Sequence, residues 1–266
     1  MKLKRAFACE LQAGKAVMIP RNSLWEALSL PMKEHMIISF AGGGGKTTSM
    51  FWLADELAGL GKRVIVTTST HIRRPQNRHI VPAEKAETVE NFIKDHEEWA
   101  FPSGGWVLVA ARPAEEGKLK SMELSQLEKL AALSDVLLVE ADGAKCLPLK
   151  LPREGEPVHL NGTDAVIGCA GLDCIGKSWE EMCFRFYLAS EIFGRSMKKA
   201  EILPEHAAGI LISEKGTRKG VGAAEYRMIL NKADDEERMA AAEAVVKAMG
   251  ESWTGKCAVT HFAEER

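Results

Sequence analysis

The chain has 266 residues, 46% hydrophobic and 27% charged, a balance typical of soluble globular proteins. The formal net charge of -2 gives no bulk electrostatic basis for binding nucleic acid or a membrane surface. We find no apolar run near eighteen residues, so no transmembrane helix is expected. Polar residues at 9–12 interrupt any apolar segment after the basic start, which argues against a signal peptide.

The six cysteines are scattered and form no C-x-x-C pair, which fits reduced thiols better than a disulfide framework. The seven histidines show no spacing typical of structural zinc. We therefore expect a cytoplasmic protein without nucleic-acid or membrane partners.

Strands and helices are predicted to alternate along most of the chain. Residues 1–35 lack this alternation, apart from a short helix after Ser23, and we treat them as an N-terminal arm. Strands are predicted at 36–41, 63–68, 106–111, 136–140, 164–169, 226–230 and 256–260, and helices at 47–60, 86–100, 124–133, 182–193, 204–212 and 233–249. This order predicts an α/β fold: three layers, a mostly parallel sheet with helices on both faces. Residues 36–266 are expected to form a single P-loop NTPase-like nucleotide-binding domain.

The most informative segment is 36–48, an apolar strand followed by glycines, a lysine and two threonines. Glycines let backbone N–H groups approach phosphate oxygens, and a helix N-terminus adds partial positive charge. Lys46 is expected to reach the terminal phosphates, and Thr47 to offer its hydroxyl to Mg²⁺. The nucleotide-binding residues predicted here are Gly42, Gly43, Gly44, Gly45, Lys46, Thr47 and Thr48. The usual first glycine is replaced by Phe40, a shortened loop that resembles those of ATP-dependent Mur-type ligases; the alternative is a flexible linker.

A second motif lies at the end of the predicted strand 136–140. Glu140 and Asp142 would lie at the carboxyl end of a buried strand, on the same side of it. In a phosphate-loop protein such an acid binds Mg²⁺, and a second acid can orient the attacking group. We expect Lys46, Glu140 and Asp142 to be catalytic, and Thr47 and Asp142 to hold the metal. The alternative is that Asp142-Gly143 is only a turn.

A third motif, Asn231-Lys232-Ala233-Asp234, follows the strand predicted at 226–230. Asn-Lys-x-Asp in this position is typical of the guanine-reading element of many GTPases. Asp234 would accept two hydrogen bonds from guanine, Lys232 would cover the base, and Asn231 would tie this loop to the phosphate loop. The alternative is a turn-forming Asn231 and an Asp234 that complements a helix dipole. GTP and ATP therefore both stay open.

Weaker candidates surround these motifs. Thr67, Thr68, Thr70 and His71 follow the second predicted strand and either contact phosphate or are ordinary strand-end residues. Lys145 and Lys150 either bind an anionic substrate, such as selenophosphate or a pterin phosphate, or are solvated loop lysines.

Together these motifs resemble the YqeC family over about residues 24–245. The stretches that carry the resemblance are Val139–Lys150, Glu156–Val158, Gly171–Lys177, Thr67–Ile72 and the glycine-rich loop. Small departures occur in the loop and at Ser69, and neither removes a phosphate contact. The resemblance implies a cytosolic accessory protein of selenium-dependent molybdenum hydroxylases, which helps to make or insert their selenium-containing cofactor. Its partners would be nucleotide and the hydroxylase or its cofactor-insertion machinery.

Three functions follow as hypotheses. The first is a Mg²⁺-dependent nucleotide hydrolase or transferase that acts in this cofactor maturation. The second, suggested by the short loop with two threonines, is an ATP-dependent ligase or kinase acting on a small cofactor precursor. The third is a nucleotide-gated chaperone with little turnover.

Overall fold

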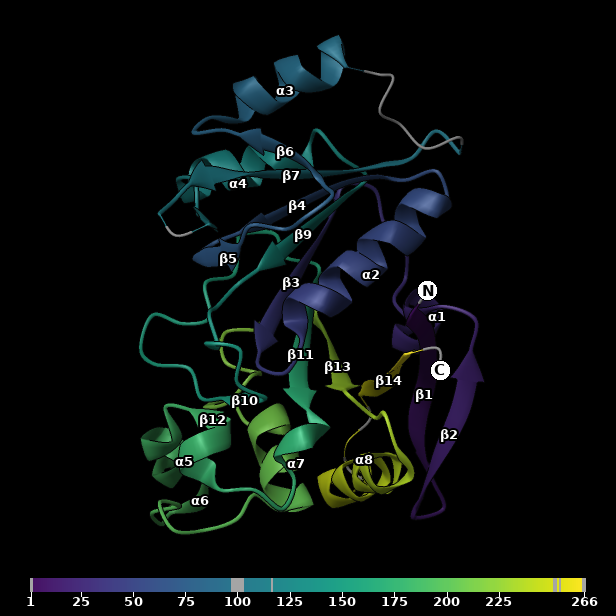
Figure 1. Cartoon of the computed structure of the whole chain (residues 1–266), viewed down its shortest axis with the longest axis vertical. Coiled ribbons are helices and arrows are strands. Elements are labelled where there is room, and N and C mark those ends of the chain that lie inside the picture. The colour runs from purple at the N-terminus through teal and green to yellow at the C-terminus, as the bar shows by residue number, and fades with distance from the viewer. Residues whose placement is uncertain (1, 97–102, 116, 251–252, 254, 265–266) are drawn as a thin grey trace.

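The computed structural model describes residues 2–96, 103–115, 117–250, 253 and 255–264 (Figure 1). Within these residues, twelve strands form one large sheet with the phosphate-loop strand near its centre. The strands along the sheet are β2 (Lys15–Arg21), β1 (Lys2–Gln12), β14 (Lys256–Glu264), β13 (Glu225–Asn231), β11 (Ala165–Gly171), β3 (Met36–Gly42), β9 (Val136–Glu140), β4 (Arg63–Thr68), β7 (Trp106–Pro113), β8 (Lys118–Lys120) and β5 (His71–Arg73), while β6 (His79–Pro82) pairs with β7.

The central strands are parallel, as the alternation of strands and helices predicts. Parallel pairing links β14, β13, β11, β3, β9, β4, β7 and β6 in that order. Among the described strands, antiparallel pairing is confined to the two ends, where β1 joins β14 and β2 joins β1, and where β8 joins β7 and β5. The sheet is thus mixed and mostly parallel, and the carboxyl ends of its central strands share one edge.

Helices cover both faces of the sheet, which confirms the three-layer α/β prediction. One face packs on α1 (Leu24–Leu28) and α2 (Lys46–Gly59), and the other on α3 (Ala86–Asp95), α4 (Leu124–Ala131), α7 (Pro204–Ile212) and α8 (Glu236–Met249) (Figure 1). Strand alternation explains this division: Ile38 and Phe40 join the core beneath α1 and α2, whereas Ile37 joins the core beneath α3 and α4. Both faces of the central strands are therefore apolar.

The first 35 residues, which we treated as an N-terminal arm, contain two strands that join the sheet. Residues 2–21 form the hairpin β1–β2, and Cys9 of β1 pairs with Cys257 of β14. The short helix after Ser23 is present as α1, and Ser23 caps it by accepting from the Glu26 N–H. Pairing with a strand at the other end of the chain leaves no local sequence signal.

The helix predicted at 182–193 is also wrong over most of its length. Short elements replace it: α5 (Trp179–Met182), β12 (Cys183–Phe184), the 3₁₀ helix η3 (Phe186–Ala189) and α6 (Ser190–Phe193). Cys183 and Phe184 pair instead with β10 (Leu149–Lys150), and Arg185 adopts a left-handed conformation with φ of 62°. A left-handed residue cannot continue a right-handed helix.

The remaining predicted helices need smaller corrections. The helix predicted at 86–100 ends at Asp95 in α3, and residues 97–100 of that prediction lie outside the described residues. No helix in the described part of the chain is both long and apolar enough to cross a bilayer.

Candidate functional site

The glycine-rich loop leaves β3 at the carboxyl edge of the sheet and packs tightly on its neighbours. Gly42, Gly44 and Gly45 have φ values of 97°, 60° and 95°, which favour glycine over other residues. A Cβ on Gly44 would lie 2.0 Å from the backbone nitrogen of Gly171. The glycines are therefore required by backbone packing, whatever the loop binds.

The first N–H groups of the loop donate hydrogen bonds within the protein. The N–H groups of Gly43 and Gly44 donate to the carbonyls of Cys169 and Leu147, both at 2.9 Å. Helix α2 then begins at Lys46 with Gly45 as its N-cap, without a side-chain cap or an acidic residue in its first turn. Its first N–H groups have no intrahelical acceptors and add to the positive end of the helix dipole. This helix start favours an anion.

Lys46 is buried, and its ammonium group is held by the loop and by an acid. Its Nζ donates to the Gly42 carbonyl at 2.7 Å and lies 3.2 Å from Asp142 Oδ1. Burial lowers the pKa of Lys46, but the nearby charges of Asp142 and Glu140 outweigh it, and the net pKa is raised. Lys46 is therefore a cation at neutral pH.

The two predicted acids have different partners. Glu140, at the end of β9, accepts a hydrogen bond from the Thr47 hydroxyl at 2.5 Å. Burial raises the pKa of Glu140, although Lys46 and Thr47 oppose the shift. Asp142 instead lies behind the loop, where it accepts from the Gly42 N–H at 3.2 Å and pairs with Lys46. Thr47 and Asp142, which we expected to share a metal, contact different groups.

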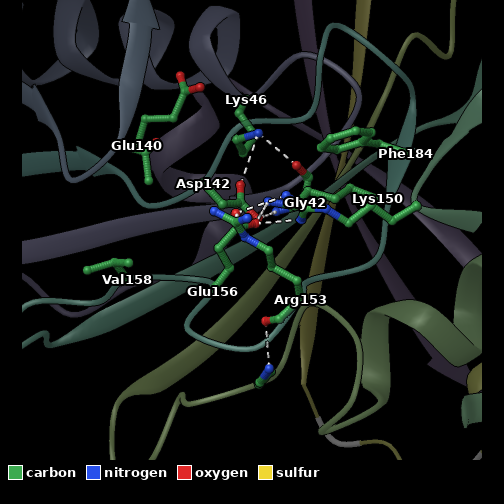
Figure 2. Close-up of polar contacts among 12 residues, drawn as sticks. Gly42, Lys46, Glu140, Asp142, Lys150, Arg153, Glu156, Val158 and Phe184 are labelled. Carbon is green, nitrogen blue, oxygen red and sulfur yellow. Dashed lines mark hydrogen bonds and ion pairs between the residues drawn. The ribbon is translucent and has the colours of Figure 1, made fainter. Parts of the chain in front are cut away.

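Asp142 is the first link in a buried chain of charges (Figure 2). Lys150 Nζ lies 2.8 Å from Asp142 Oδ2 and 2.5 Å from Glu156 Oε2. Glu156 in turn receives two hydrogen bonds from the Arg185 guanidinium, at 2.7 and 3.0 Å. Burial would raise the pKa of Glu156, but Arg185 and Lys150 lower it to about 2. This series of paired charges links the glycine-rich loop to Arg185, which directly follows β12.

Sequence reasoning missed most of this chain of charges. Lys150 is 1% exposed, so it is neither a solvated loop lysine nor open to an anionic substrate. Its apolar neighbours, Leu149 and Leu151, gave no signal, because strand alternation points the residue between them to the opposite face. Arg185 carried no local signal.

The motif after β13 reaches the phosphate loop through its first residue. Asn231 is buried, and its side-chain amide donates to the Gly44 carbonyl at 2.7 Å while its Oδ1 accepts from Ser49 and Thr260. Lys232 borders the cleft and pairs with Asp173 at 2.6 Å. These contacts place the motif beside the loop.

Asp234 is oriented differently from its neighbours in the motif. One of its carboxylate oxygens accepts from the Phe262 N–H at 2.9 Å, and the other lies 3.5 Å from Arg238. It is therefore bound to the backbone of β14 and is not among the residues that border the cleft.

The cleft in front of the loop has a volume of about 810 Å³ and a basic lining. Its lining includes the glycine-rich loop, Glu140, Lys145 and Lys232, together with His71, Arg73 and Lys118. The lining includes one carboxylate, Glu140, and five lysine or arginine residues: Lys46, Arg73, Lys118, Lys145 and Lys232. Two of the five, Lys46 and Lys232, are paired with Asp142 and Asp173. The lining suits a polyanion.

The two threonines at the end of β4 form hydrogen bonds within the protein. Thr67 Oγ1 donates to the Ala110 carbonyl at 2.6 Å, and Thr68 Oγ1 donates to the Glu140 carbonyl at 3.0 Å. Thr68 therefore positions the backbone of the acid rather than a ligand. Across the described ranges, no three His, Cys, Asp or Glu residues group closely enough to hold a metal by themselves.

Comparison with known proteins identifies the family. The profile of the family described as YqeC protein matches residues 38–187, more than half of the chain. The protein YqeC of Escherichia coli strain K12, described as uncharacterized, is 32% identical over 146 residues. That match covers 54% of this chain and 55% of the relative, so it spans about half the length of each. The matched range spans the glycine-rich loop, Glu140, Asp142, Glu156 and Arg185, and the chain belongs to the YqeC family.

Proposed function

We propose that the cleft binds a nucleoside triphosphate with Mg²⁺, in a P-loop NTPase-like manner, and that the protein hydrolyses or transfers its terminal phosphoryl group. One observation carries this proposal. Lys46 and Thr47 begin a helix directly after a glycine loop, and Thr47 contacts Glu140 at the end of the adjacent strand β9. Strand, glycines, cation, hydroxyl and acid thus meet at one sheet edge, where open α/β sheets bind ligands.

The donor set at Thr47 and Glu140 fits Mg²⁺. This ion prefers oxygen ligands, keeps several waters, and takes one or two carboxylates together with substrate phosphates. The Thr47 hydroxyl and the Glu140 carboxylate supply such oxygens beside the loop. We therefore propose Glu140, rather than Asp142, as the carboxylate that holds the metal with Thr47. A bound ion would neutralise charge on the phosphates.

Lys46 and Asp142 have complementary roles in this proposal. The Lys46 ammonium would exchange its contact with Asp142 for the terminal phosphates, as a point charge on a flexible stem. Asp142 would keep Lys150 at 2.8 Å, so the exchange leaves no buried carboxylate without a cation. Asp142 then acts through Lys46 and the Gly42 N–H, as a positioning residue of the loop.

Both GTP and ATP stay open as the nucleotide. The contact between Asn231 and the loop supports a base-reading role for its motif. The Asp234 carboxylate would have to leave the Phe262 N–H and Arg238 to accept from guanine. Asp234→Asn tests this point: a preference for GTP that is lost in the variant supports guanine reading, and equal binding of ATP and GTP by the unmodified protein refutes it.

Membership of the YqeC family supports a proposal for the cellular role. We propose an accessory function, in the cytoplasm, in maturation of the selenium-containing cofactor of molybdenum hydroxylases, with the hydroxylase or its insertion machinery as partner. The basic lining of the cleft favours a second candidate, an ATP-dependent ligase or kinase with an anionic acceptor.

Calorimetric titration with ATP and GTP, each with and without Mg²⁺, tests the proposal. Lys46→Ala should weaken triphosphate binding by more than tenfold, since it removes the lysine of the loop. Lys129→Ala, at an exposed position in α4, is the matched control and should bind like the unmodified protein. Thr47→Val should remove the dependence on Mg²⁺. A folded Lys46→Ala protein that binds ATP and GTP with unchanged affinity would refute the nucleotide proposal.

A further inference from the structure

The cleft extends beyond the phosphate loop to a short ribbon formed by β5 and β8. Arg73 pairs directly with Lys118 across this ribbon, and His71 pairs with Lys120. Between them Ile72 and Leu119 are buried, so the basic residues lie on the opposite, outer side of the ribbon. Arg73 and Lys118 therefore lie side by side on the ribbon, and both line the cleft.

The opposite wall of the cleft is the turn that follows Asp142. Lys145 and Cys146 are consecutive left-handed residues, with φ values of 50° and 62°. Lys145 Nζ lies 5.0 Å from the centre of the Phe184 ring, and the Arg73 guanidinium lies 3.9 Å from the Cys146 sulfur. The contact between Arg73 and Cys146 brings the two walls together. A left-handed turn packed on an aromatic ring thus holds a cation at the mouth of the cleft.

The cations of this outer region differ in their partners from the cations near the glycine-rich loop. Lys46 pairs with Asp142 and Lys232 pairs with Asp173. In the part of the chain that the structure describes, neither Arg73 nor Lys145 has an acidic partner: Arg73 contacts a thiol, and Lys145 contacts an aromatic ring. The uncompensated positive charge therefore lies on the outer side of the cleft, away from the Thr47–Glu140 pair.

We propose that Arg73, Lys118 and Lys145 form a second anion site, the outer subsite, which binds a phosphate group of a small acceptor molecule. A planar guanidinium favours bidentate contact with phosphate oxygens, and two lysines supply further positive charge. The nucleotide's phosphates would occupy the loop, and the acceptor's phosphate would occupy the outer subsite of the same cleft. The ligand's role as acceptor of a phosphoryl group depends on the proposed function, whereas the anion site is inferred from the contacts of Arg73 and Lys145 alone.

Cys146 offers a direct probe of this site. It is the one exposed cysteine of the six, so alkylation at neutral pH should be selective, and mass spectrometry verifies the modified residue. Iodoacetate carries a negative charge and iodoacetamide is neutral. Because both reagents react with the same thiolate, the ratio of their rates reports the local potential and not the thiolate fraction.

The rate ratio of iodoacetate to iodoacetamide should fall about threefold in Arg73→Gln and again in Lys145→Gln, as expected for removal of an exposed charge. Lys129→Gln changes the net charge equally at a distant exposed position and should leave the ratio unchanged. Equal ratios in Arg73→Gln, Lys145→Gln and Lys129→Gln would overturn the proposal.

Protection of Cys146 then tests ligand binding. Inorganic phosphate and glycerol phosphate should slow the iodoacetamide reaction in the unmodified protein and in Lys46→Met, but not in the Arg73→Gln/Lys145→Gln double variant. Protection that is lost in Lys46→Met and kept in the double variant would mean that the anion occupies the loop, and would overturn the outer subsite. Succinate that protects as well as phosphate would overturn its assignment to a phosphate group.

Binding of ATP and GTP with Mg²⁺ is measured on the same samples. Protection by phosphate without nucleotide binding would refute the proposed function and keep the outer subsite. Nucleotide binding without protection of Cys146 by phosphate would refute the outer subsite and keep the proposed function.

Discussion

Asp142→Asn should destabilise the protein strongly, because it removes one negative charge that holds two buried lysines. Asp142 lies 2.8 Å from Lys150 Nζ and 3.2 Å from Lys46 Nζ, and all three side chains are at most 4% exposed. At an effective dielectric constant of about 20, charges at these separations attract by about 5 to 6 kcal/mol per pair. Desolvation offsets much of this attraction, and losing one partner of a buried pair costs about 3 to 5 kcal/mol.

For a chain of this length, that loss should lower the melting temperature by roughly 6 °C or more, measured by circular dichroism without nucleotide. In the Asp142→Asn protein, Lys150 is a buried cation that has lost the negative charge of Asp142. Adding Lys150→Met removes this cation, and at least half of the lost free energy of unfolding should return. Lys129→Met in the same background is the matched control and should restore nothing. An Asp142→Asn protein that melts within about 2 °C of the unmodified protein would refute the argument that this charge holds the loop.

Three further predictions concern the loop and the chain of charges. Gly44→Ala should cost more than about 2 kcal/mol in the urea midpoint analysis, because its Cβ would lie 2.0 Å from the Gly171 nitrogen, whereas Gly59→Ala, in open space on α2, should be neutral or stabilising; equal effects would contradict the packing argument. Asn231→Ala removes side-chain hydrogen bonds to Gly44, Ser49 and Thr260, so it should cost about 1 to 3 kcal/mol and weaken nucleotide binding in calorimetry; full stability and affinity would show that the tether is dispensable. The folded pKa of Glu156 is about 2 against an ordinary value of 4.5, so its carboxylate stabilises the fold above pH 4.5 and this contribution is lost as the pH falls toward 2. Glu156→Gln should therefore flatten the loss of stability over that range, and an acid profile identical to that of the unmodified protein would contradict the assignment.

The centre of the sheet could be predicted from the sequence because its signals are local. The apolar strand at 36–41, the glycines and the helix after Lys46 follow one another directly, and the structure has them in that order. The buried strand ending at Glu140 was predicted from its continuous apolar run, and it lies beside β3. Which acid meets Thr47 could not be predicted, because strand alternation places Glu140 and Asp142 on the same side and does not show that the chain turns behind the loop after Glu140.

The parts that could not be predicted depend on contacts between distant segments. Phe184 lies in an amphipathic stretch that favours a helix, but pairing with β10 and the left-handed Arg185 override that preference. Glu156 and Arg185 are 29 residues apart in the chain and meet only in the folded protein. The same residue types form exposed loop charges and buried ion pairs, so the sequence does not distinguish the two.

The position of β14 between β13 and β1 has a consequence for the order of folding during synthesis. The hairpin β1–β2 is synthesised well before β14, yet among the described strands β14 is the one that joins it to the rest of the sheet (Figure 1). An isolated two-stranded hairpin is marginal in water, so it has no stable place until β14 emerges. Until β14 has been synthesised, β13 has an unpaired edge on this side. The sheet can be completed at this end only by a segment that lies far from β1 in the sequence, so this part of the fold depends on a contact of high sequence separation.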